Sequence, residues 1–142
     1  MKYKELLHPQ LQMVLGKVAN TQMNPTKSYE VNKLLSAVRK ELERVREEST
    51  VILKNFVKYE NGRPKMAVDK DGAPTNDVEF IEPYSINHPD YNGAFETFEK
   101  KTANIDFRPW SLDMLADVKL SAMEIDILGP LLTDKPFLQA VN

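Results

Sequence analysis

The side chains that could carry out chemistry are few in this 142-residue sequence. Two histidines, His8 and His88, each precede a proline, and neither has a second histidine or a Glu-x-x-His pattern that would supply further metal ligands. We therefore expect each histidine to be exposed or to cap a turn. Ser85, His88 and Asp90 have the residue types of a catalytic triad. Triads draw on separate segments of a chain, so we expect none among these neighbours.

Acidic and amide side chains gather once in the second half of the sequence, at Asp69, Asp71, Asn76 and Asp77. The group loosely resembles a calcium loop, but its spacing does not match the ligand pattern of an EF-hand and no bidentate glutamate follows at the required offset. We expect a solvated turn.

Four glutamates form a second acidic group, at Glu41, Glu43, Glu47 and Glu48. These positions are spread over what we predict to be the polar face of one helix. We expect this face to be solvated rather than to bind an ion. The sequence therefore predicts no catalytic residue, no metal site and no cofactor.

Composition excludes further classes of site. The chain has no cysteine, which rules out disulfides, thiolate-bound zinc and a thiol nucleophile. A formal net charge of −2 excludes the broad basic face of a general nucleic-acid binder. No stretch approaches the roughly 18–20 apolar residues that span a bilayer. His8 and Pro9 also interrupt the segment where a signal peptide would need an apolar region. We expect neither a nucleic-acid nor a membrane partner.

One long helix is the strongest structural signal. Its apolar seam advances by alternating steps of four and three, with one polar member: Val31, Leu35, Val38, Leu42, Val45, Ser49, Ile52, Phe56 and Tyr59. Asn24 suits the N-cap and Pro25 the first helical position, while Asn61-Gly62 and Pro64 favour an end. We predict a helix from Thr26 to Glu60.

The predicted length of this helix suggests a partner. It would be a rod of about 50 Å, whereas a compact chain of this size has a diameter of about 37 Å. Either the helix kinks, or part of the seam is covered by the first helix and part by another chain, and we predict the contact with another chain. Arg108 and Trp110 could anchor an interface or form the edge of the core, and the core is favoured. The interface candidates are Leu35, Val38, Leu42, Val45, Ile52, Phe56, Arg108 and Trp110.

The remaining elements define the fold class. Leu7, Leu11, Val14 and Val18 share one face of a first helix, with Pro9 in its first turn or ending a short preceding segment. This helix and the long one should form an antiparallel hairpin. We predict one α+β domain over residues 1–142, in which residues 1–60 form the helical hairpin and residues 61–142 a small α/β part with an antiparallel sheet and short helices.

The second part is predicted from local patterns. Asp71-Gly72 favours a hairpin turn between strands 65–68 and 78–81. The stretch 82–93 reads as a loop, 94–101 as a short helix, 103–107 as a strand, and 110–118 is ambiguous. Ser121 and Glu124 form a capping box before a helix over 122–128. Phe137, Leu138 and Val141 should pack on the body or on a partner.

The order of these elements, from the Lys27–Leu34 opening of the long helix to Leu120–Glu124, resembles a family of small tailed-bacteriophage and prophage proteins known only as a domain of unknown function. The resemblance covers about Ser28 to Leu132. It implies a phage origin and brings no catalytic residues with it.

We therefore expect a non-enzymatic minor virion or assembly component that contacts itself or other phage proteins, in the host cytoplasm or the virion. The alternative is an inhibitor that binds a host factor or sequesters a small signalling ligand, with loop 82–93 and the side chains of Tyr84, Tyr91 and Trp110 forming its pocket.

Overall fold

The computed structural model describes residues 1–106 and 108–133, and it has an α+β fold, as predicted. The described chain divides into two compact units. The first comprises residues 1–44, 101–106 and 108–133, and the second comprises residues 45–100. The prediction of a single domain divided near residue 60 stays a prediction. The predicted packing of Phe137, Leu138 and Val141 lies outside the described residues.

The first unit begins with a short helix, α1 (Tyr3–Leu6), and a longer one, α2 (Leu11–Asn20). Pro9 lies in the turn between them, which confirms that it follows a short preceding segment. On α2, the predicted apolar face of Leu11, Val14 and Val18 is buried. A β-bridge between Lys2 and Thr102 ties the start of the chain to the segment that re-enters this unit.

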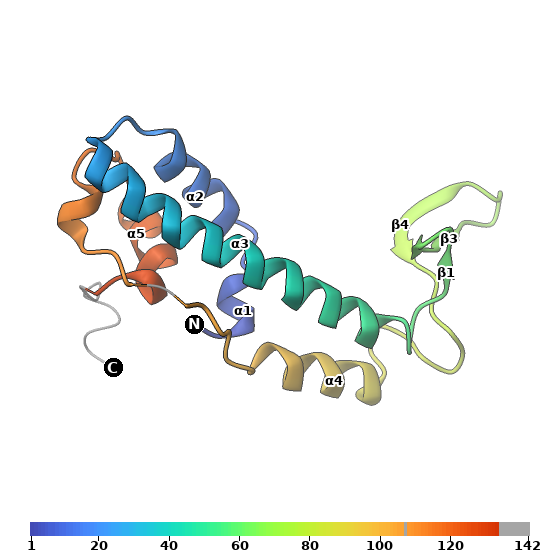
Figure 1. Ribbon diagram of the computed structural model, residues 1–142. Coiled ribbons are helices and arrows are strands. Elements are labelled where there is room, and N and C mark those ends of the chain that lie inside the picture. Colours follow the sequence, from blue (N-terminus) through green and yellow to red (C-terminus); the bar gives the residue numbers. More distant parts are fainter. Residues whose placement is uncertain (107, 134–142) are drawn as a thin grey trace. The chain divides into compact units, whose positions relative to one another are not determined.

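The long helix, α3 (Pro25–Leu53), contributes residues to both units. It begins as predicted, because the side-chain oxygen of Asn24 accepts a hydrogen bond of 2.9 Å from the backbone N–H of Lys27. Within the first unit, α2 runs back along the N-terminal part of α3 and forms the predicted helical hairpin (Figure 1).

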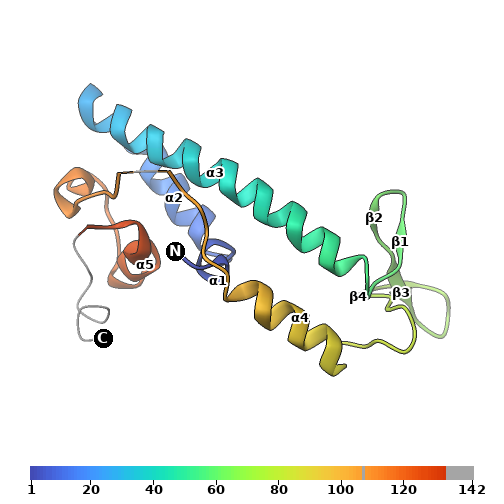
Figure 2. The same ribbon diagram turned by 60° about the horizontal axis from the view of Figure 1, so that its bottom comes forward.

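The predicted end of the long helix is wrong. The helix stops at Leu53, and Tyr59 belongs to strand β1 (Tyr59–Glu60), which pairs with β2 (Arg63–Pro64). Asn61 and Gly62 have φ values of 53° and 75°, so they form the tight turn of this hairpin, visible in Figure 2. Asn-Gly favours such a turn as strongly as it favours a helix end. The four-and-three spacing of apolar residues continues beyond Leu53 to Phe56 and Tyr59, so this spacing did not indicate where the helix ends.

A small group of elements closes the first unit: the 3₁₀ helix η1 (Leu112–Leu115), helix α5 (Ala122–Leu128) and the 3₁₀ helix η2 (Gly129–Leu131). The capping box before α5 is confirmed. Ser121 Oγ accepts from the N–H of Glu124 at 3.2 Å, and Glu124 Oε1 accepts from the N–H of Ser121 at 3.0 Å.

The strand predicted at 103–107 is absent over residues 103–106, and Phe107 lies outside the described residues. The backbone of this segment finds other partners. Ala103 donates its N–H to the carbonyl of Met1, and Asn104 donates its N–H to the carboxylate of Glu41. The alternation of apolar and polar residues therefore reflects an extended segment laid against α1 and α3, not a strand in a sheet.

The second unit contains two small antiparallel sheets and one helix, α4 (Pro89–Glu99). Strand β3 (Met66–Val68) pairs with β4 (Pro74–Val78), so the predicted Asp71-Gly72 turn is confirmed while the second strand begins earlier than the predicted 78–81. Residues 79–81 pair instead with the segment around Val57.

Helix α4 also begins earlier than predicted, inside the stretch expected to be a loop, and ends at Glu99. Its first position is Pro89, which needs no N–H donor there. Pro89, which favours a loop when only the sequence is considered, therefore begins a helix in the structure. Among the described residues, no helix combines the length and apolar character needed to cross a membrane.

Candidate functional site

The most buried charged side chain of the described residues is that of Glu41 on α3, which is 5% exposed. Its Oε1 accepts a hydrogen bond of 2.5 Å from Arg44 Nε, and its Oε2 accepts from Arg44 Nη2 at 3.1 Å and from the N–H of Asn104. Arg44 Nη2 also donates to the hydroxyl of Tyr3 at 2.7 Å. These hydrogen bonds, first that to Glu41 and then that to Tyr3, raise the pKa of the Arg44 guanidinium above its usual range.

The prediction that Glu41 lies on a solvated face is therefore wrong. Glu41 follows Val38 by three residues and precedes Val45 by four, so it occupies the buried face of α3. Its neighbour in the acidic group, Glu43, is exposed as predicted. The position of Glu41 in the helical repeat, on the same face as Val38 and Val45, could have predicted its burial. The charge can be buried because Arg44 and Asn104 donate hydrogen bonds to both carboxylate oxygens. This network joins α1, α3 and the 101–106 segment.

Both histidines have local structural roles. His88 Nδ1 accepts from the N–H of Asp90 at 3.1 Å and thereby caps α4, and His8 Nδ1 accepts from the N–H of Gln10 at 3.1 Å. His88 therefore contacts the backbone of Asp90. The acidic group at 69–77 is exposed, and Asp69 Oδ1 accepts from the N–H groups of Asp71 and Ala73, both at 2.9 Å, as in a solvated turn.

The structure places most interface candidates in the interior. A buried position is shared by six of them: Leu35, Val38, Leu42, Val45, Phe56 and Trp110. Ile52 is half-buried and Arg108 is exposed. A second chain could reach the six buried side chains only if the fold opened. In the folded chain, Ile52 and Arg108 are the candidates with surface available for contact.

Trp110 belongs to the core, as the favoured interpretation predicts. It is 0% exposed, and its backbone forms a parallel bridge with Leu132. Tyr84 and Tyr91, which the alternative prediction names with Trp110, belong to an aromatic cluster of the second unit. Both contact the ring of Phe56 edge to face, with ring centroids 4.8 and 5.6 Å away.

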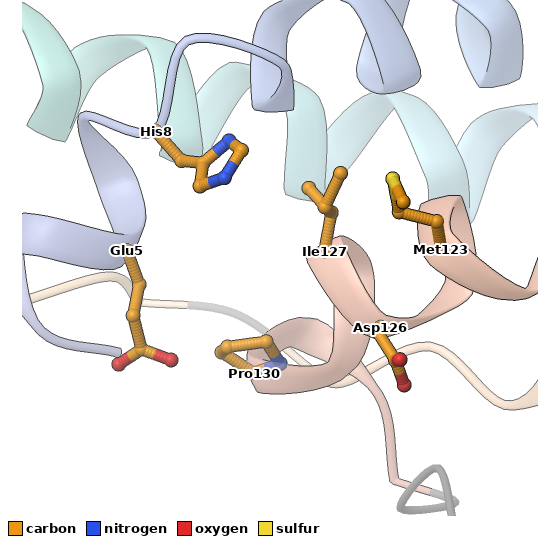
Figure 3. Close-up of a pocket in the computed structure, with 6 residues that line it drawn as sticks. All are labelled: Glu5, His8, Met123, Asp126, Ile127 and Pro130. Carbon is orange, nitrogen blue, oxygen red and sulfur yellow. The ribbon is translucent and has the colours of Figure 1, made fainter. Parts of the chain in front are cut away.

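An open groove lies on the first unit between α5 and the turn that joins α1 to α2 (Figure 3). Its volume is about 250 Å³, and it is lined by Glu5, His8, Met123, Asp126, Ile127 and Pro130. We call it the α5 groove. The spacing of its apolar residues follows from the helix: Met123 and Ile127 are four residues apart and share one face of α5, and Pro130 begins the next turn.

Polar groups stand at the rim of the α5 groove. Figure 3 shows the carboxylates of Glu5 and Asp126 on either side of Pro130. Glu5 Oε1 accepts from the backbone N–H of Lys2 at 2.8 Å, and because this amide carries no charge, the negative charge of Glu5 is not neutralised by it. The N–H of Gln10 donates a hydrogen bond to His8 Nδ1, so Nδ1 is an acceptor and the neutral ring of His8 carries its proton on Nε2. Sequence reasoning missed this groove because its two walls come from opposite ends of the chain.

A second depression on the first unit is lined by more charged side chains. It has a volume of about 380 Å³ and is lined by Ala37, Lys40, Glu41, Arg44, Asn104 and Asp106. Its lining mixes both signs of charge, and Glu41 and Arg44 are paired with each other. The α5 groove, with its apolar floor and its acidic rim, is the better candidate for binding.

Comparisons of the chain with protein-family models, with curated proteins and with solved structures found no match. Within the described ranges, no three His, Cys, Asp or Glu side chains come together as a group that could hold a metal ion.

Proposed function

We propose that this protein acts without catalysis, through contacts with other proteins, as a minor virion or virion-assembly component located in the virion or the host cytoplasm. The observation that carries the proposal is the α5 groove, an open apolar depression with Met123 and Ile127 on its floor. Met123 is 67% exposed, whereas Leu128 at the other end of the same helix is buried. An exposed apolar side chain beside half-buried ones, here Met123 beside Ile127 and Pro130, is typical of a protein-contact site.

The uses of the titratable side chains support the same proposal. Glu41 and Arg44 hold three segments together, His8 and His88 satisfy backbone N–H groups, and Glu124 caps α5. A reactive centre needs convergent groups whose hydrogen bonds are available to a substrate. These five groups are instead engaged in holding local structure. The phage assignment itself rests on the resemblance of the sequence to the phage family.

Two measurements on the full chain test the proposal. Size-exclusion chromatography with light scattering, over a range of concentrations, should show self-association or co-elution with other proteins of the same phage. Mass spectrometry of purified virions should detect the chain, or else an assembly intermediate should contain it. The proposal would be overturned if the protein is strictly monomeric, forms no such complex, and is missing from purified virions and from assembly intermediates.

A further inference from the structure

We propose that Asn61 is a site of spontaneous backbone modification, at which the folded chain loses ammonia and forms an aspartyl or β-aspartyl bond to Gly62. The inference is independent of the proposed function and draws on the second unit alone, all of whose residues the structure describes. Three observations carry it: the sequence of the turn, the hydrogen bonds of its backbone, and its place at the exposed end of a short hairpin.

The reaction is a ring closure followed by hydrolysis. The backbone nitrogen of Gly62 attacks Cγ of Asn61, a C–N bond forms, and the bond from Cγ to Nδ2 breaks. Nδ2 leaves as ammonia and takes up the proton of the Gly62 nitrogen, so nothing is oxidised or reduced. Water then opens the cyclic imide at either carbonyl, which gives aspartate or a β-aspartyl bond. A glycine after the asparagine favours the attack because it has no Cβ atom to crowd the ring.

The chain places a glycine after an asparagine or an aspartate three times: Asn61-Gly62, Asp71-Gly72 and Asn92-Gly93. These pairs differ in the hydrogen bond of the glycine nitrogen. Gly72 donates its N–H to the carbonyl of Asp69 at 3.1 Å. Gly93 lies within α4, where the N–H of each residue past the first turn bonds to the carbonyl four residues before it. Among the hydrogen bonds of the described residues, none engages the N–H of Gly62 or the side chain of Asn61.

The tip of the β1–β2 hairpin is a part of the second unit that can open by itself. Its strands have two residues each and form a sheet of their own. Asn61 and Gly62 are exposed, and Figure 2 shows their turn at the end of the hairpin. Asn61 has a φ of 53°, in the left-handed region that is less favourable than extended backbone for any L residue. Because exposed turns with few contacts open at the lowest free energies, the nitrogen of Gly62 can reach Cγ of Asn61 without unfolding of the rest of the unit.

The Asn92-Gly93 pair has the same residue types in a different setting. The first turns of α4 must unwind before the nitrogen of Gly93 can reach Cγ of Asn92. His88 caps the start of this helix, and Tyr91 packs edge to face against Phe56 with ring centroids 5.6 Å apart. Opening at this pair therefore costs more free energy than opening of the hairpin tip, so the chain contains an internal control for the effect of structure.

The modification would change the second unit at one place. A β-aspartyl bond carries the chain through Cβ and Cγ of residue 61 and so adds one atom to the backbone of a two-residue turn. The pairing of Glu60 with Arg63 depends on the length of this turn and would lose its register. The aspartyl product keeps the length of the turn and adds a negative charge next to Glu60. Chemical ageing of the protein would therefore be concentrated at this hairpin.

The test is peptide mapping by mass spectrometry of the full chain, incubated at mildly alkaline pH either folded or in concentrated urea. Conversion appears as the mass gain of an oxygen in place of an NH group, and a methyltransferase specific for β-aspartyl carboxylates labels that bond. In the folded chain we expect Asn92 to convert at least about tenfold more slowly than Asn61, which corresponds to about 1.4 kcal/mol of extra opening free energy. In urea, where the fold protects neither pair, the two rates should be similar.

Asn61→Gly is the matched variant for the folded chain. Two glycines suit the same tight turn, but the variant has no amide side chain at position 61, so the peptide that contains the hairpin should show no mass gain. The NMR signals of Glu60 and Arg63 should stay constant during incubation of the variant. In the native chain these signals should change at the rate at which Asn61 converts.

Three results would overturn the inference. Equal conversion of Asn61 and Asn92 in the folded chain would show that the fold does not distinguish the two pairs. Absence of conversion at Asn61 in the folded chain would show that the β1–β2 turn protects it. The same excess of conversion at Asn61 in urea would assign the difference to the neighbouring sequence and not to the structure. None of these results bears on the proposed function, which rests on the α5 groove of the first unit.

Discussion

The two units of this protein are stabilised in different ways. In the first unit, each of the helices α2, α3 and α5 contributes aliphatic side chains that are fully removed from water, and Leu11, Val38 and Leu128 are each 0% exposed. In the second unit, the buried hydrophobic residues among those described are few: Val45, Phe56, Val57 and Phe98. Much of its packing is made by half-buried rings that meet edge to face, such as Phe80 with Tyr91 at 5.2 Å.

This difference shows how two parts of one short chain can reach order by separate routes. Aliphatic burial on helices follows from periodicity and contributes in proportion to the area that is removed from water. Each pair of rings that meet edge to face contributes about 0.5–1.5 kcal/mol beyond the effect of the area that it buries. Tight turns such as that of Asn61 and Gly62 then fix the short strands of the second unit. Substitutions should therefore be most costly in the first unit.

The largest expected effect compares two positions of α3, one in each unit. Leu35→Ala, at a position 3% exposed, should lower the free energy of unfolding by about 2–5 kcal/mol, because it leaves a cavity in a packed core. Ile52→Ala, at a half-buried position, should cost about 1–2 kcal/mol, since much of that side chain already meets water. Urea unfolding of both variants measures the difference. Equal losses would show that the two units are packed alike.

The next effect concerns the buried carboxylate of the first unit. Glu41→Ala should lower the free energy of unfolding by about 1–3 kcal/mol, because the N–H of Asn104 and the guanidinium of Arg44 lose their acceptor. Glu43→Ala, two residues along the same helix but exposed, should change it by no more than about 0.5 kcal/mol. Urea unfolding again provides the measurement. A larger loss for Glu43→Ala would contradict the structural role of Glu41.

Local sequence signals predicted the features that depend on a few neighbouring residues. The Asn24 cap, the Ser121–Glu124 box, the Asp71-Gly72 turn and the helical hairpin were all found in this way. The end of α3 and the burial of Glu41 were missed, because each depends on partners distant in the sequence. The α5 groove was missed for the same reason, since Glu5 and Ile127 come together only in the fold.

Glycines of the second unit should respond in opposite directions. Gly62, with a φ of 75°, lies in the left-handed region, so Gly62→Ala should lower the free energy of unfolding by about 1 kcal/mol. Gly93 lies within α4, and a Cβ atom there would meet nothing within 4 Å. Gly93→Ala should therefore raise the free energy of unfolding by about 0.5–1 kcal/mol. Thermal unfolding of both variants shows the signs, and a gain from Gly62→Ala would contradict the turn between β1 and β2.

The smallest effect concerns one half-buried carboxylate in each unit, each paired with an exposed lysine. The pKa of Glu124 is lowered, first by its hydrogen bond from Lys17 and then by the N–H of Ser121, and the pKa of Glu79 is lowered by Lys58 and Lys65. A lowered pKa in the folded state means that the stabilisation is present above the ordinary value of 4.5. It is lost as the pH falls through the folded pKa, when these carboxylates take up protons.

Replacing these carboxylates by amides should therefore matter only above that pH range. Glu124→Gln can still accept from the N–H of Ser121 but loses its ion pair with Lys17, whose Nζ lies 2.8 Å from Glu124 Oε2. Its melting temperature should be slightly below that of the native chain at pH 6 and equal to it at strongly acid pH. Glu79→Gln should follow the same course in the second unit, and added salt should shrink both differences because the lysine of each pair is exposed. If the melting temperatures of these variants stay equally far below that of the native chain at acid pH, the packing of the side chains, and not their charge, makes these contacts stabilising.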